Sequence, residues 1–89
     1  MAIQKEIQDY MEKHIEMLVS QTKTYLPFIK VAFPNTNISE ACYGLIAGNA
    51  LSIFLNQYAM RMQYPSPSDF EEFGQIMSKY KGRVEEFFK

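Results

Sequence analysis

The sequence predicts an all-α fold, a three-helix antiparallel bundle, from three observations. Apolar residues recur every three or four positions along most of the 89 residues, which is the spacing of amphipathic helices. Turns containing proline divide the chain at 34–37 and 64–67. Between them, residues 41–60 contain no Asp, Glu, Lys or Arg. We therefore expect a single helical domain over 1–89, in which two amphipathic helices flank an apolar central one.

A long first helix is expected over about 2–32. Its apolar stripe begins with Ile3 and Ile7 and continues to Ile29. Pro27 interrupts this stripe, because proline has no N–H to donate to the carbonyl of residue 23 and its ring crowds that carbonyl. We expect either a kink near residue 27 or a short second segment with Pro27 in its first turn.

The central helix is expected over about 38–63. Asn37 and Glu40 have the spacing of a capping box, with Asn in place of the usual Ser or Thr. The run from Tyr64 to Pro67 contains two prolines and cannot continue a helix. Because this helix is apolar on most of its circumference, it must be buried on most of it.

A third helix is expected over about 67–88. Ser66 is a suitable N-cap, since it places Pro67 at the first helical position and Asp69 at the third. Ser68 and Glu71 form an equally good box in another register. The apolar seam has heptad spacing and consists of Phe70, Phe73, Met77, Tyr80, Val84 and Phe87.

Small residues gather on one sector of the central helix and predict a close helix crossing. Two glycines inside a helix cost about 1 kcal/mol each relative to alanine, so we expect a packing gain to offset them. Two flanking helices cannot surround such an apolar cylinder, and a second copy would complete its burial. We therefore predict a homodimer, a six-helix bundle, with a self-interface made of Ala41, Gly44, Gly48, Ser52 and Ala59.

A band of uncharged polar side chains lies beside this sector. Asn49, Ser52, Asn56 and Gln63 form either a solvated strip or a buried ladder that fixes the register of a dimer. The solvated strip is favoured, because buried polar groups need every hydrogen-bond partner. Asn49, Asn56 and Gln57 also argue against a membrane span, as does the absence of a basic cluster at either end.

Candidate catalytic and metal-binding residues are few. His14 is the only histidine, and Glu12 and Glu16 are two residues away from it, on other faces of a helix. Cys42 is the only cysteine, so it forms no internal disulfide and is best placed in the core. Phosphate loops, paired carboxylates and nucleophile elbows are missing from the sequence. We expect no enzyme activity, no cofactor and no metal.

The all-helical chorismate mutases are similar in size and helix count. That family holds the carboxylates of its substrate with arginines on a long first helix. The first helix expected here has no arginine, and the chain contains only Arg61 and Arg83. The motif is missing, so the sequence does not support membership of that family.

The charge balance and the ends of the chain bear on partners and location. Nine basic and ten acidic residues are interspersed, for a net charge of −1, which does not favour nucleic acid. Met1 to Glu16 lacks the pattern of a secretory signal, and a lone cysteine suits a reducing compartment. We expect a cytoplasmic protein that binds neither nucleic acid nor a membrane.

The function predicted from these patterns is a small non-catalytic module for protein–protein interaction or regulation. It would self-associate through the central helix and could bind a further protein. The alternative is a small-molecule or lipid-binding protein with an apolar pocket between the helices. The residues expected to line that pocket are Tyr58, Met60 and Met62.

Overall fold

The computed structural model describes residues 3–88, where all regular secondary structure is helical. The expected all-α class is therefore confirmed. The count of three helices was wrong: the first helix is divided, at residue 21 rather than at the kink expected near residue 27, and the third is divided where no break was expected. The expected start of the first helix near residue 2 lies outside the described residues. The segments are α1 (Lys5–Ser20), α2 (Thr22–Ala32), α3 (Ile38–Ala59), α4 (Pro67–Ser78) and α5 (Lys81–Glu86).

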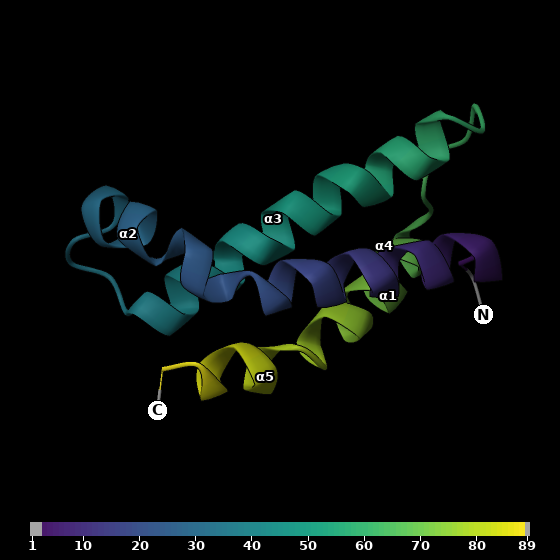
Figure 1. Cartoon of the computed structure of the whole chain (residues 1–89). Coiled ribbons are helices and arrows are strands. Elements are labelled where there is room, and N and C mark those ends of the chain that lie inside the picture. Colours follow the sequence, from purple (N-terminus) through teal and green to yellow (C-terminus); the bar gives the residue numbers. More distant parts are fainter. Residues whose placement is uncertain (1–2, 89) are drawn as a thin grey trace.

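The described part of the molecule is elongated, with principal extents of 38 × 21 × 20 Å (Figure 1). Helices α1 and α3 run along the long axis, and α3 contacts α1, α2 and α5. Helix α2 lies at one end of the molecule, and the turn after α3 lies at the other (Figure 1). One side of α3 is therefore packed against the other helices, and this arrangement decides which of its residues face outward.

The first helix is interrupted at Gln21, whereas Pro27 lies inside α2. The buried hydroxyl of Thr22 donates a 2.6 Å hydrogen bond to the carbonyl oxygen of Val19. Bonds of this kind compete with the helical ladder and favour a break. Pro27 is tolerated because Lys23, whose carbonyl lacks the N–H of residue 27, is exposed and can bond to water.

The caps expected at Asn37 and Ser66 are present, and α4 uses the Ser66 register rather than the alternative Ser68–Glu71 box. The Asn37 side chain accepts a 3.1 Å hydrogen bond from the N–H of Glu40 at the start of α3. At the start of α4, the Ser66 hydroxyl accepts from the N–H of Asp69 at 3.2 Å, and the Asp69 carboxylate accepts from the N–H of Ser66 at 2.8 Å. Pro67 occupies the first turn of α4, where a missing N–H costs nothing.

The end of α3 comes at Ala59, four residues before the expected end. Met62 has a φ of 56°, in the left-handed region. Its N–H donates to the carbonyl of Ala59 at 2.9 Å, and the N–H of Gln63 donates to the carbonyl of Tyr58 at 3.0 Å. These two bonds form a Schellman motif, with methionine where glycine is usual.

The expected third helix is divided at Lys79–Tyr80. There the N–H of Tyr80 donates to the carbonyl of Met77 at 2.9 Å, which is a tighter turn than the α-helical one. Within the expected seam, Phe73, Met77, Tyr80 and Val84 are buried, whereas the two terminal members are partly exposed. The break therefore keeps the centre of the seam in the core but not its ends.

The core is centred on Phe54, whose side chain is fully buried. Its ring stacks on that of Phe73, with centroids 4.4 Å apart, and contacts the ring of Tyr58 at 5.0 Å. Helix α1 contributes a matching buried stripe, which includes Ile7, Met11 and Ile15. Helix α3 buries one residue in every four, and these are Cys42, Ile46, Ala50, Phe54 and Tyr58.

Candidate functional site

The small residues predicted to form a helix crossing lie on the outside of the chain. Gly44, Gly48, Ser52 and Ala59 are exposed, and Ala41 is half-buried. A methyl group added at either glycine would meet no heavy atom within 4 Å, apart from the helix's own backbone. The structure thus brings these five residues onto one surface, but no helix of the described chain packs on the glycines.

Two leucines that the sequence reasoning did not select belong to the same surface. Leu51 is 38% exposed and Leu55 is 41% exposed. Together with Gly44 and Gly48 they form a series with steps of four, three and four residues, the spacing of a helix-packing seam. We call these four residues the Gly–Leu seam. That spacing was the signal in the sequence that could have identified the leucines.

The outward face of α3 is the Gly–Leu seam with its small neighbours. The face carries no ionisable side chain, and the charges that bound it are Glu40 at one end and Arg61 at the other. A guanidinium nitrogen of Arg61 donates to the carbonyl and side-chain oxygens of Gln57 at 2.8 and 3.1 Å. The outward face consists of Ala41, Gly44, Gly48, Leu51, Ser52, Leu55 and Ala59.

The band of uncharged polar residues also faces solvent in the single chain. Asn49, Ser52, Asn56 and Gln63 are all exposed. This is what the solvated-strip interpretation expects. A buried ladder would require a second chain to cover them.

Helix α3 is also long and apolar enough to span a membrane, judged by length and composition alone. It has 22 residues, and the mean hydropathy of its most apolar window is 1.4. A core helix of a soluble protein can have the same composition, but it is then mostly buried. Here only 22% of the window is buried. The described chain alone therefore covers one side of α3 and leaves the outward face without cover.

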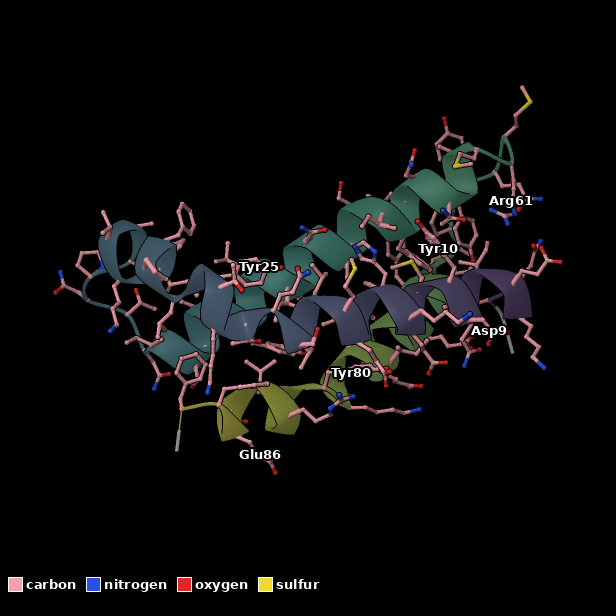
Figure 2. The ribbon with its side chains drawn as sticks, in the orientation of Figure 1. Asp9, Tyr10, Tyr25, Arg61, Tyr80 and Glu86 are labelled. Atoms are coloured by element: carbon pink, nitrogen blue, oxygen red, sulfur yellow. The ribbon has the colours of Figure 1, made fainter. Side chains whose placement is uncertain are left out.

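A second candidate site is an apolar cavity of about 250 Å³ between α2 and α3. Tyr25 lies at its wall, between the two helices (Figure 2), and its hydroxyl donates to the side-chain oxygen of Gln21 at 3.2 Å. A cavity of this size can hold a compact apolar guest of one or two rings. Its lining residues are Leu18, Thr24, Tyr25, Phe28, Leu45, Ile46 and Asn49.

The pocket residues predicted from the sequence lie in different environments. Tyr58 is buried in the core, whereas Met60 is 68% exposed and Met62 is 95% exposed. Burial raises the pKa of the Tyr58 phenol, and the charge of Asp69 and a hydrogen bond to it raise this pKa further. Tyr58 therefore supports the core, while the two methionines belong to the exposed turn after α3.

The single histidine and cysteine occupy structural positions. His14 is half-buried and stacks on the ring of Tyr10, with centroids 6.2 Å apart. Cys42 is buried, which raises the pKa of its thiol, although a hydrogen bond with Thr22 partly opposes the increase. Within residues 3–88, no three His, Cys, Asp or Glu side chains come together in a group that could hold a metal ion.

Comparison of the chain with models of protein families, with curated proteins and with solved structures found no match.

Proposed function

We propose that this chain is a small cytoplasmic, non-catalytic interaction module that self-associates through the outward face of α3. The observation that carries the proposal is the mismatch between the composition of α3 and its burial. A helix this apolar needs cover on most of its circumference, yet its outward face, which includes Leu51 and Leu55, is exposed in the single chain. A second copy would supply the missing cover and turn the chain into a dimeric helical bundle.

A protein surface suits this face better than hydrocarbon does. Asn49, Ser52 and Asn56 lie on or beside it and are exposed. Amide side chains are costly inside a bilayer, but at a protein interface they can remain at a hydrated rim. Lipid binding is therefore the competing outcome that the experiment must separate from self-association.

The outward face of α3 suits a second copy of the chain because this face carries no charge. In a two-fold symmetric contact, a residue near the axis meets its own copy, so any charge there would be repelled. Residues 41–60 include no charged side chain. A strongly acidic or basic partner would find no counter-charge there, so an equally neutral surface is the better match.

The test is the solution mass of the wild type and of Gly48→Leu, measured by light scattering after gel filtration. Gly74→Leu is the matched control, because Gly74 is also exposed inside a helix and also has open space at its Cβ position. Leucine is a good helix former, so both substitutions should preserve their helices. Only the first places a bulky group on the outward face.

We expect the wild type and Gly74→Leu to have twice the 10.4 kDa mass of the chain, and Gly48→Leu to be monomeric. A wild type that stays monomeric at millimolar concentration would overturn the proposal. If that monomer sediments with neutral phosphatidylcholine vesicles, the face is a lipid-binding surface instead.

The cavity beside α2 supports a second candidate function, the binding of a small apolar molecule. Its lining has no charged side chain, and it offers the hydroxyl groups of Thr24 and Tyr25 and the amide of Asn49. We expect indole, used as a probe, to shift the amide NMR signals of the lining residues. Leu45→Trp should fill the cavity and abolish the shifts. Unchanged spectra at millimolar indole would contradict this function.

A further inference from the structure

The Gly–Leu seam has an internal symmetry that selects one arrangement of two copies. Gly48 and Leu51 are equally far from the midpoint between residues 49 and 50, and so are Gly44 and Leu55. In a two-fold symmetric interface, if residue i contacts residue j, then j also contacts i. When two helices run in opposite directions about that midpoint, each glycine therefore faces a leucine.

We infer that two copies of α3 pair antiparallel about a two-fold axis between residues 49 and 50. Leu51 and Leu55 of each copy fill the space over Gly48 and Gly44 of the other. This inference rests on the self-association proposed above and adds its orientation and register. The open space at both glycines is what receives the leucines.

Packing distinguishes this arrangement from a parallel one. In a parallel pair, leucine would face leucine at one end of the seam and glycine would face glycine at the other. The leucine layers would hold the helix axes apart and leave voids at the glycine layers, where the lining atoms lose their contacts. In the antiparallel pair, each layer combines one large and one small residue, so the two axes keep a constant separation.

The helix dipole favours the same orientation. An antiparallel pair places the N-terminus of one α3 beside the C-terminus of the other. The charges that bound the helix do not decide the orientation, because Arg61, at the end of the molecule away from α2 (Figure 2), already pairs with the carboxylate of Glu6 in α1 at 3.9 Å.

Spin labels can measure the orientation directly. Asn49 and Met60 are exposed and eleven residues apart, about three turns, so they lie on the same flank of α3. Each would be changed to cysteine in a Cys42→Ser chain and labelled. If Cys42→Ser does not fold, the native chain serves, because Cys42 is buried and slow to react.

For the antiparallel pair, the two backbones at residue 49 should lie about 10 Å apart, and those at residue 60 about 33 Å apart, from the helical rise and a usual axis separation. Equal distances at the two positions would indicate a parallel pair and overturn the inference while leaving self-association intact. No dipolar coupling between labels at millimolar protein would overturn both.

A second test, which needs no cysteine, exchanges the small and the large side chain at facing positions of the interface. Gly48→Leu makes leucine face leucine in the antiparallel dimer, and Leu51→Gly makes glycine face glycine. Each variant alone should dimerise at least tenfold more weakly than the wild type. Their equimolar mixture restores both glycine–leucine contacts and should form a heterodimer of wild-type strength. A mixture no stronger than its components would overturn the proposed register.

Discussion

Substitutions of the two glycines of the Gly–Leu seam should raise the stability of the monomer and lower the affinity of the dimer. In the single chain, a methyl group at Gly44 or Gly48 meets open space. Alanine is favoured over glycine inside a helix by about 0.8–1.0 kcal/mol. Gly44→Ala and Gly48→Ala should therefore each stabilise the monomer, and the double variant should gain about 2 kcal/mol.

For a domain of this size, 2 kcal/mol corresponds to an increase in Tm of about 10 °C. Self-association should respond in the opposite way, because each added methyl occupies space that a leucine of the partner fills. Overpacking costs about 1–3 kcal/mol, and 1.4 kcal/mol is a tenfold change in Kd. Each substitution occurs twice in a two-fold dimer, so the cost is about 2–6 kcal/mol, and we expect each single variant to weaken dimerisation by at least about 30-fold.

The assay combines urea unfolding, at protein concentrations low enough that the midpoint no longer changes with dilution, with sedimentation equilibrium at higher concentration. Gly74→Ala is the control, since it fills equally open space on α4. It should stabilise the chain and leave the dimer unchanged. If Gly44→Ala and Gly48→Ala stabilised the monomer without weakening the dimer, the glycines would not lie in the interface.

Three further predictions concern the fold. Phe54→Ala removes the ring at the centre of the core and should lower the free energy of unfolding by about 3–5 kcal/mol; a loss below 1 kcal/mol in urea unfolding would contradict the core described above. Met62→Gly removes the strain of a methionine with a left-handed φ and should raise the free energy of unfolding by about 1 kcal/mol. A decrease would show that the turn depends on the methionine side chain. The pKa of Tyr58 is raised on folding above its ordinary value of 10.0, so its contribution to stability is fully present below about pH 10 and is lost as the pH rises through the folded value. The difference in unfolding free energy between the wild type and Tyr58→Phe should therefore narrow above pH 10; a difference that stays constant with pH would be the contrary result.

The features that the sequence predicted correctly are mostly local. The Ser66–Asp69 box and the Asn37 cap follow from side chains that bond to backbone groups within three residues, so no other part of the chain is needed to infer them. The helical class follows from spacing alone. These signals required no knowledge of tertiary packing.

The features that the sequence did not predict depend on contacts between distant segments. The break at Gln21 reflects the burial of Thr22. The sequence could not indicate this burial, because Pro27, a stronger helix breaker, lies in the same stretch. Leu51 and Leu55 were overlooked because apolar residues surround the helix, so composition could not show which side the other helices would cover. The five small residues lie on one surface of α3, and the partner that would cover them is a proposal.

Isotope-filtered NMR on an equimolar mixture of labelled and unlabelled chains can show directly whether the outward face of α3 is a self-interface. We expect contacts between chains from the methyl groups of Leu55 to the α-protons of Gly44, and from those of Leu51 to Gly48. If the millimolar sample shows no contact between chains, or only contacts away from α3, the outward face of α3 is not a self-interface.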